Sequence, residues 1–261
     1  MDLGLAGKRV FVSGSTQGIG YAIAAACAAE GASVVINGRT AARVDRTIAR
    51  LRGAHPGGDI AGIAADFADP AQVQALIDAL GPVDVLVNNV GLFDVAPFAE
   101  IPDEEWQRYF EINVLSGVRL SRALLGGMIE RDWGRILFIG TESAVDVPGD
   151  MIHYGATKAA ALALSNGLAQ LTRGTGVTVN TVLGGPTYSD GVAATVERIA
   201  AEQSMPVAQL KAALVRPASL LQRFIEPEEI AHLVAYLASP LSSATNGAAL
   251  RAEGGALPTV L

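Results

Sequence analysis

An apolar run that breaks into a glycine-rich turn near the N-terminus constrains this chain more than any other feature. Residues 10–20 are VFVSGSTQGIG, with glycines at positions 14, 18 and 20. A strand that ends in such a turn presents backbone N–H groups where the next helix begins, and the helix dipole adds positive charge. The pattern predicts an anion-binding site. Its spacing differs from the G-x-G-x-x-G fingerprint, and a purely structural tight turn is the alternative.

Short runs rich in Val, Ile and Leu alternate with helical segments along the chain. Runs without polar alternation are typical of strands buried on both faces of a parallel sheet. We expect strands at 9–13, 33–37, 60–65, 83–88, 135–140 and 177–183, and helices at 19–30, 41–51, 70–80, 103–131, 152–173 and 230–238. The repeated βαβ pattern predicts a single α/β domain over residues 1–261, with a doubly wound parallel sheet and helices on both faces.

The segment around residues 189–223 interrupts this alternation. It contains two short helical segments, at 192–203 and 206–214. We expect an insertion over the carboxyl edge of the sheet, where lids and substrate pockets are built. A surface excursion that only packs against the domain is the alternative.

Composition restricts the partners and the compartment. A formal net charge of -7 argues against nucleic acid or an anionic membrane as the main partner. No apolar run reaches transmembrane length although mean hydropathy is +0.35, and the N-terminus lacks a signal-peptide layout. The single cysteine, Cys27, lies in an alanine-rich helical stretch, which favours a small core residue. We expect a soluble cytoplasmic protein and assign no metal ligands.

A tyrosine and a lysine four residues apart form the second informative motif. Tyr154 and Lys158 begin a long alanine-rich helical segment, so their side chains share one helix face. A tyrosine with an ordinary pKa of about 10 is a poor acid–base catalyst near neutrality, and a nearby ammonium favours the phenolate. The spacing therefore indicates a catalytic pair, with chance as the alternative because tyrosines and lysines at this spacing also occur without function.

Three motifs in order resemble those of the short-chain dehydrogenase/reductase family. Residues 13–20, SGSTQGIG, resemble its T-G-x-x-x-G-x-G turn, residues 88–91, NNVG, resemble N-N-A-G, and Tyr154 with Lys158 resembles Y-x-x-x-K. Residues 248–255 are similar to the family's last strand and D-G-G, with Glu253 replacing the aspartate. The resemblance covers essentially the whole chain. It implies a Rossmann fold of about seven strands and a nicotinamide enzyme similar to 3-oxoacyl-carrier-protein reductases.

The resemblance also implies roles for four catalytic residues. Tyr154 would pass a proton to or from the substrate oxygen, while Lys158 lowers the tyrosine pKa and binds the nicotinamide ribose. Asn113 matches the asparagine that holds a proton-relay water, with a polar residue satisfied by nearby backbone as the alternative. Thr141 stands thirteen positions before the tyrosine, where the family uses serine. Ser143 is a reserve candidate because it would point to the same side if the strand continued.

The cofactor residues follow from the same motifs. NAD-preferring sites usually place a carboxylate near the end of the second strand, whereas here that acid is missing and Arg39 follows. A guanidinium can bind a 2′-phosphate, so we favour NADP(H) over NAD(H), although Gln17 is neutral where many NADP-preferring relatives carry a cation. Asp66 would accept the adenine amino group or act as a turn residue. The resemblance assigns cofactor binding to Gly14, Ser15, Thr16, Gln17, Gly18, Ile19, Gly20, Arg39, Asp66, Phe67, Asn89, Gly91, Tyr154, Lys158, Thr187 and Ser189.

These features predict an NADP(H)-dependent oxidoreductase that interconverts a ketone and a secondary alcohol, with Tyr154 as general acid and base. An NAD(H)-dependent alcohol dehydrogenase, a reductase of imines or activated double bonds, and a weakly catalytic cofactor-binding or sensing protein are the alternatives. The expected partner is a small carbonyl or alcohol. The long helical segments at 103–131 and 152–173 resemble those through which relatives form dimers and tetramers, so we expect a homo-oligomer.

Overall fold

The strands form the parallel sheet that the βαβ alternation predicts. A computed structural model describes residues 1–215 and 218–260, and seven strands within them pair in the order β3-β2-β1-β4-β5-β6-β7. Each neighbouring pair is parallel. The strands are β1 (Arg9–Val12), β2 (Ser33–Gly38), β3 (Ile60–Ala64), β4 (Val85–Asn88), β5 (Gly134–Thr141), β6 (Val177–Gly184) and β7 (Ala249–Ala252). The strand order reverses between β1 and β4, which is the switch point where doubly wound sheets bind ligands.

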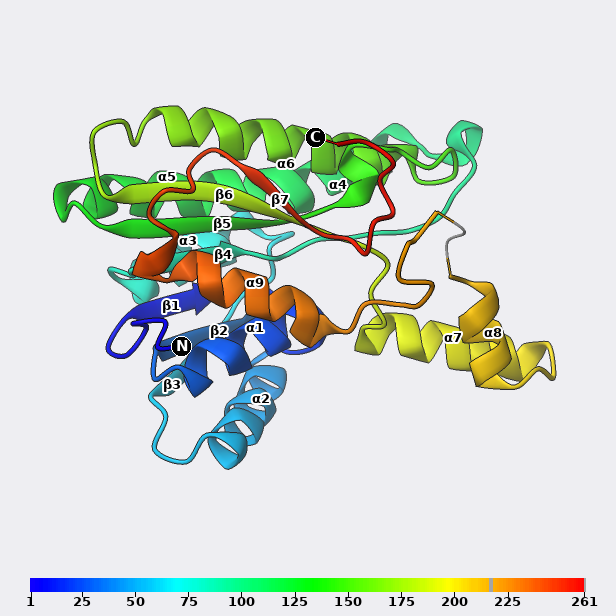
Figure 1. Cartoon of the computed structure of the whole chain (residues 1–261), viewed down its shortest axis with the longest axis horizontal. Coiled ribbons are helices and arrows are strands. Elements are labelled where there is room, and N and C mark those ends of the chain that lie inside the picture. The colour runs from blue at the N-terminus through cyan, green and yellow to red at the C-terminus, as the bar shows by residue number, and fades with distance from the viewer. Residues whose placement is uncertain (216–217, 261) are drawn as a thin grey trace.

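Helices cover both faces of this sheet (Figure 1). One face carries α1 (Gly18–Ala29), α2 (Ala41–Ala54) and α9 (Pro227–Ala238). The other carries α3 (Pro70–Leu80), α4 (Asp103–Phe110), α5 (Ser116–Glu130) and α6 (Ile152–Gln170). Among the helices of the described residues, none is long and apolar enough to cross a lipid bilayer.

The side chains of β1 show why its sequence is apolar throughout. Val10 and Val12 pack into the core beneath α1 and α9, whereas Phe11 packs into the core on the opposite face. All three are fully buried, and burying each such side chain contributes about 1.5–3 kcal/mol. Cys27 of α1 is also fully buried, and this burial raises its pKa to about 12. It is a core thiol, as its surroundings in the sequence predict.

The helix expected over residues 103–131 is interrupted. A π-helical turn, Glu111–Leu115, separates α4 from α5, and Asn113 lies within it. A π turn inserts one extra residue into the helical ladder and is frequent at functional sites. The expectation of one regular helix over residues 103–131 is wrong at this turn, which inserts an extra residue between two α-helical segments.

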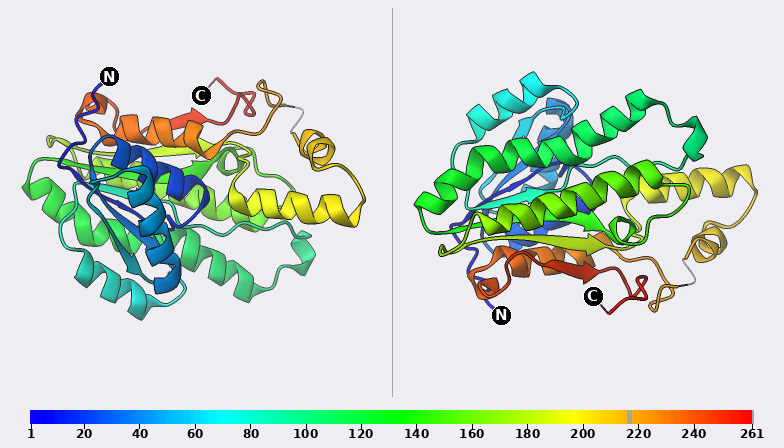
Figure 2. Two further views of the ribbon diagram at one scale, coloured as in Figure 1. Left: turned by 90° about the horizontal axis from the view of Figure 1, so that it is seen from below. Right: turned by 90° about the horizontal axis from the view of Figure 1, so that it is seen from above.

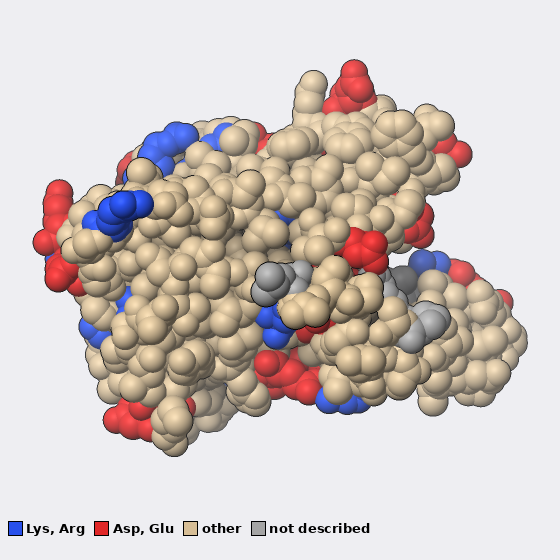
Figure 3. Space-filling model, turned by 45° about the horizontal axis from the view of Figure 1, so that its top comes forward, with Lys and Arg blue, Asp and Glu red and all other residues tan. Residues whose placement is uncertain are grey.

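Helices α7 (Asp190–Glu202) and α8 (Val207–Ala213) project from the end of the sheet where the strands finish (Figures 1 and 2). We call these two helices the lid. They share a small apolar core of Val196, Ala200 and Leu210. In the space-filling view a hollow separates the lid from the body of the molecule (Figure 3). Residues 216 and 217 of the predicted insertion lie outside the described residues.

Candidate active site

The glycine-rich turn is held in place by an asparagine from the next motif. Gly14 and Gly18 have φ values of +61° and +56°, a backbone conformation that favours glycine. Asn89 Nδ2 donates hydrogen bonds to the carbonyl oxygens of Ser13 (3.0 Å) and Gly14 (2.9 Å). A Cβ on Gly20 would lie 2.5 Å from Asn89 Nδ2, so only glycine fits there. The first two motifs of the sequence therefore form one interlocked unit.

Asn37, which the sequence analysis did not single out, anchors the same turn from β2. Its Oδ1 accepts a hydrogen bond from Gly14 N–H (3.0 Å), and its Nδ2 donates to the carbonyl oxygen of Ile63 (3.1 Å). Ser15 is fully buried, and its hydroxyl donates to the Val12 carbonyl (2.7 Å). The Ser15 side chain thus faces the protein interior, and its backbone N–H donates to the Asn37 carbonyl (2.8 Å), so the role of Ser15 in cofactor binding stays a prediction.

A cavity of about 410 Å³ opens beside the turn, at the switch point between β1 and β4. Its wall combines the glycine-rich turn, the ends of β2 and β3, the loop after β4, and the lid. Most of the predicted cofactor residues line it: Gly14, Thr16, Gln17, Gly18, Ile19, Gly20, Arg39, Asp66, Phe67, Asn89, Gly91 and Ser189. The remaining ones, Ser15, Tyr154, Lys158 and Thr187, lie outside this wall.

The chemistry of the wall fits a nicotinamide dinucleotide. Helix α1 begins at Gly18, and the side chain of its N-cap residue Gln17 makes no capping hydrogen bond to the described residues. The first-turn N–H groups of α1 therefore need an anionic or polar partner from elsewhere. Phe67 and Ile112 add apolar surface suited to a flat aromatic ring. The N–H groups at the start of α1 and the apolar surface together match a phosphate-bearing nucleotide.

Two guanidinium groups lie on the β2 side of the cavity. Arg39 is exposed just after β2, and Arg43 of α2 is partly exposed. Arg43 Nη2 donates a hydrogen bond to Gln17 Oε1 (2.6 Å), which ties this cation to the glycine-rich turn. Arg43 is not among the predicted cofactor residues. The amide oxygen of Gln17 is what holds its guanidinium at the cavity.

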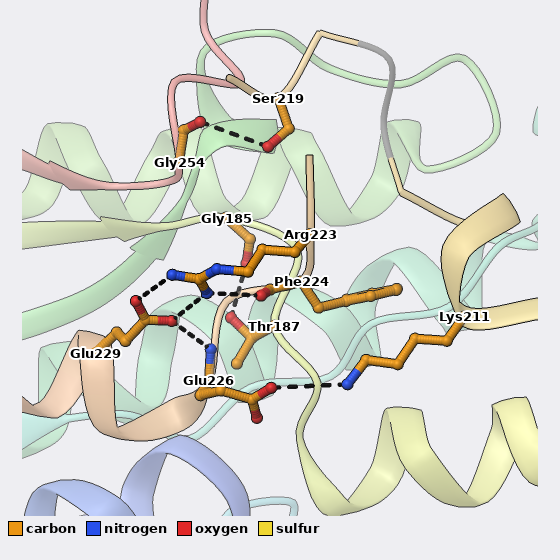
Figure 4. A network of polar contacts seen from close by, with 9 residues as sticks. All are labelled: Gly185, Thr187, Lys211, Ser219, Arg223, Phe224, Glu226, Glu229 and Gly254. Carbon is orange, nitrogen blue, oxygen red and sulfur yellow. Dashed lines mark hydrogen bonds and ion pairs between the residues drawn. The ribbon is translucent and has the colours of Figure 1, made fainter. Parts of the chain in front are cut away.

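Asp66 and Thr187 both take part in local turns. Asp66 lines the cavity, and its carboxylate accepts a hydrogen bond from Ala68 N–H (3.0 Å). Thr187 is nearly buried, and its hydroxyl donates to the Gly185 carbonyl (2.8 Å; Figure 4). Of the two predicted cofactor residues that follow β6, Ser189 lines the cavity and Thr187 does not. The predicted roles of Asp66 and Thr187 in binding stay predictions.

Lys158 is buried against the end of β5. Its side chain is 7% exposed, and its Nζ donates a hydrogen bond to the Ile139 carbonyl (3.0 Å). Burial lowers its pKa from 10.5 to about 8. The Nζ lies 5.9 Å from the centre of the Tyr154 ring. A Cβ on Gly91 would lie 3.2 Å from this Nζ, so the glycine of the N-N-V-G motif leaves room for the lysine.

Asn113 fastens the π turn to two other parts of the site. Its Oδ1 accepts a hydrogen bond from Leu92 N–H (2.7 Å), and its Nδ2 donates to the Leu92 carbonyl (3.1 Å). The same Nδ2 donates to Thr157 Oγ1 (2.9 Å), next to Lys158. Asn113 is therefore a buried amide satisfied by its neighbours, which was the alternative interpretation. Its role toward a relay water stays a prediction.

The segment after β5 differs from the expected continuation of the strand. The strand ends at Thr141, and residues Glu142–Ala144 form a 3₁₀ turn. Ser143 is buried, and its N–H donates to Thr141 Oγ1 (3.2 Å). The expectation that Ser143 points to the same side as Thr141 assumed a continuing strand, and it is wrong. The chain turns after Thr141, so the strand alternation does not reach Ser143.

Glu142, which the sequence analysis did not single out, is buried between these two hydroxyl groups. The Thr141 hydroxyl donates to Glu142 Oε2 (2.6 Å), and the Ser143 hydroxyl donates to Glu142 Oε1 (3.3 Å). Tyr154 is partly exposed, and its ring makes an edge contact with Phe93 at 6.4 Å between centroids. Phe93 also lines the cavity, so this contact connects the tyrosine to the predicted cofactor site.

Comparisons with known proteins show which proteins the chain is similar to. Residues 8–200 match the family model described as short chain dehydrogenase. The chain is 46% identical to the uncharacterized oxidoreductase YvaG of Bacillus subtilis over 263 residues, covering all of both chains. It is 32% identical over 253 residues to the 3-oxoacyl-[acyl-carrier-protein] reductase of Escherichia coli, covering 95% of this chain and 97% of that one.

A solved structure extends this likeness to three dimensions. The L-sorbose reductase of Gluconobacter frateurii, determined with NADPH and L-sorbose, superposes with a TM-score of 0.95. It is 31% identical, and the match covers all of both chains. The fold, the interlocked glycine-rich turn and these matches lead to one conclusion: the chain belongs to the short-chain dehydrogenase/reductase family and is an NAD(P)-dependent oxidoreductase.

Proposed function

We propose that the protein is an NADP(H)-dependent oxidoreductase that interconverts a ketone and a secondary alcohol, with Tyr154 as general acid and base. The observation that carries this proposal is the buried Lys158 ammonium, one helical turn after Tyr154 and hydrogen-bonded to the Ile139 carbonyl. A cation at this position stabilises a phenolate, which brings the proton affinity of the tyrosine toward the working range of an acid–base catalyst.

The chain's own groups account for the proton transfer. In the reductive direction the Tyr154 hydroxyl gives its proton to the carbonyl oxygen, and the Lys158 ammonium stabilises the phenolate left behind. In the oxidative direction the phenolate takes the alcohol proton. Thr141 is assigned the orientation of the reacting oxygen, for which its hydroxyl must turn away from the Glu142 carboxylate that accepts its proton in this structure. When bound, the nicotinamide ring supplies the hydride for reduction or accepts it in oxidation.

The preference for NADP(H) rests on Arg39 and Arg43. Both guanidinium groups line the cavity near the end of β2, where an NAD-preferring site would place a carboxylate. Guanidinium groups bind phosphate with two parallel hydrogen bonds and lose little energy to desolvation. The NADPH bound in the related L-sorbose reductase supports the same preference. We infer that Arg43 supplies the second positive charge that the neutral Gln17 lacks.

Matched arginine variants test this preference for NADP(H). Arg39→Ala and Arg43→Ala should each raise the Kd for NADPH about ten-fold, the cost of one charge-assisted contact, and leave the Kd for NADH within two-fold. Arg46→Ala is the control, because Arg46 is an exposed arginine of α2 outside the cavity wall. Equal losses for NADPH and NADH would show that the 2′-phosphate is not recognised here.

A turnover assay tests the reaction itself. The probes are L-sorbose and an acetoacetyl thioester, a ketose and a 3-oxoacyl compound that follow the names of the two characterised relatives. We expect NADPH consumption, followed at 340 nm, with at least one of them and slower consumption of NADH. Faster turnover with NADH would favour the NAD(H)-dependent dehydrogenase. Tight NADPH binding without turnover of these or a broader ketone panel would favour a sensing protein.

A further inference from the structure

The first residue of the lid touches the glycine-rich turn. Asp190 Oδ2 accepts a hydrogen bond from Gly18 N–H at 2.7 Å, although 172 residues separate the two in the sequence. Gly18 is the first residue of α1, whose N-cap side chain makes no capping bond within the described part of the chain. The Asp190 carboxylate is therefore an anionic partner of the α1 N-terminus, a position that the helix dipole favours.

This contact involves a wall of the proposed cofactor site. Gly18 lines the cavity from the turn, and Ser189, the N-cap of α7, and Gly191 line it on either side of Asp190. A Cβ on Gly18 would lie 3.3 Å from the Ser189 Cβ, so turn and lid are in close contact. A phosphate that accepts hydrogen bonds from the first turn of α1 would meet the Asp190 carboxylate. The two anions would compete for one donor and repel each other.

The far end of the lid is held by separate contacts (Figure 4). Lys211 of α8 lies 3.6 Å from a carboxylate oxygen of Glu226 and 3.5 Å above the Tyr188 ring. The returning chain is fixed by Arg223, which donates hydrogen bonds to both carboxylate oxygens of Glu229 (2.6 and 2.8 Å). Arg223 lowers the pKa of Glu229 to about 2. The lid can therefore stay attached at this end when Asp190 leaves Gly18.

We propose that Asp190 is a latch that holds the lid on the glycine-rich turn and is displaced when the cofactor's diphosphate binds. The inference rests on the proposed function. Cofactor binding then releases the first turn of α7 from the glycine-rich turn. The latch also lowers cofactor affinity, because only unlatched molecules bind. A latch closed in three-quarters of the molecules would weaken the apparent affinity about four-fold.

Binding measurements with a charge-matched control test the latch. Isothermal titration of NADPH into Asp190→Asn should give a Kd at least three-fold lower than in the wild-type protein. Glu197→Gln changes the net charge equally, on an exposed position of the same helix, and should leave the Kd unchanged. Adenosine 2′-monophosphate, which has no diphosphate, should bind the wild-type protein and Asp190→Asn equally well.

A second readout does not depend on any ligand. Without cofactor, backbone amides of residues 190–202 should exchange hydrogen at least three-fold faster in Asp190→Asn than in the wild-type protein or in Glu197→Gln, because the latch no longer holds α7. Thermal melting confirms that each variant is folded.

The outcomes separate the latch from the proposed function. If the wild-type protein binds NADPH and Asp190→Asn binds it with equal or lower affinity, the latch alone is overturned. Lower affinity in Asp190→Asn would indicate that Asp190 clamps the cofactor. Equal tightening of NADPH and adenosine 2′-monophosphate would also overturn it, by showing a general charge effect. A wild-type protein that binds neither NADPH nor NADH would overturn the proposed function, and the latch with it.

Discussion

The buried charge of Lys158 should lower the free energy of unfolding, and the size of this effect should depend on pH. Burial lowers the lysine pKa from 10.5 to about 8, a shift of about 2.5 units. Each unit corresponds to about 1.4 kcal/mol, so holding the charged ammonium in the folded protein costs about 3 kcal/mol at pH 7. Lys158→Met keeps the length of the side chain and removes the charge. It also leaves the Ile139 carbonyl without its donor, at a cost of about 1–2 kcal/mol. The net gain at pH 7 is therefore about 1–2 kcal/mol.

The pH dependence separates the charge from the lost hydrogen bond. Between pH 8 and pH 10.5 the unfolded chain holds the Lys158 proton and the folded protein does not. Wild-type stability therefore rises with pH in this window, and the full cost is present only below about pH 8. From pH 7 to pH 9.5 the advantage of Lys158→Met over the wild-type protein should shrink by about 2 kcal/mol. The missing hydrogen bond contributes equally at both pH values.

Urea denaturation followed by circular dichroism, at pH 7 and pH 9.5 with equal salt and equal protein concentration, measures this difference. Lys158→Arg is the matched control. Arginine keeps its proton across the whole range. The free energy of unfolding of Lys158→Arg should therefore fall further below that of the wild-type protein between pH 7 and pH 9.5, by the same amount of about 2 kcal/mol. A free-energy difference between Lys158→Met and the wild-type protein that does not change with pH would refute the reasoning.

Three further expectations follow from the packing. Gly20→Ala should abolish NADPH binding, measured by titration, because the new Cβ would overlap Asn89 Nδ2 and the Gly14 carbonyl, each 2.5 Å away; normal affinity would show that the turn is not the binding element. Asn113→Ala should lower the free energy of unfolding by about 2–4 kcal/mol in urea, because the three hydrogen bonds of this buried side chain are lost; a change below 1 kcal/mol would contradict the structural role of its amide. The protein should elute as a symmetric dimer or tetramer in size-exclusion chromatography with light scattering; a monomer would contradict the association expected through the long helical segments.

The sequence predicts the strands and the interlocked motifs well because their signals are local. The runs at β1 and β2 are short and largely apolar, a pattern typical of strands buried on both faces of a parallel sheet. Short right-handed connections and the family resemblance predict the doubly wound parallel sheet, whereas its strand order, 3-2-1-4-5-6-7, comes from the structure. Tyr154 and Lys158 share a helix face because their spacing is one turn.

The parts of the site that the sequence did not predict depend on contacts between distant segments. Arg43 belongs to a regular amphipathic helix, and only its hydrogen bond to Gln17 turns it toward the cavity. Asp190 follows a loop and begins a lid helix, and no local pattern indicates its bond to Gly18. The 3₁₀ turn after Thr141 buries Glu142, a charged residue that a sequence pattern would place on the surface. In each case tertiary packing decided which side chain faces the site.

The central claim is that Tyr154 exchanges the proton with the reacting oxygen. Tyr154→Phe removes the hydroxyl and keeps the ring that contacts Phe93. With the best ketone of the panel, its NADPH-dependent kcat should fall at least about 100-fold, the usual contribution of a general acid, while the Kd for NADPH stays within two-fold of the wild-type value. Turnover by Tyr154→Phe at the wild-type rate, with NADPH still bound, would contradict the account.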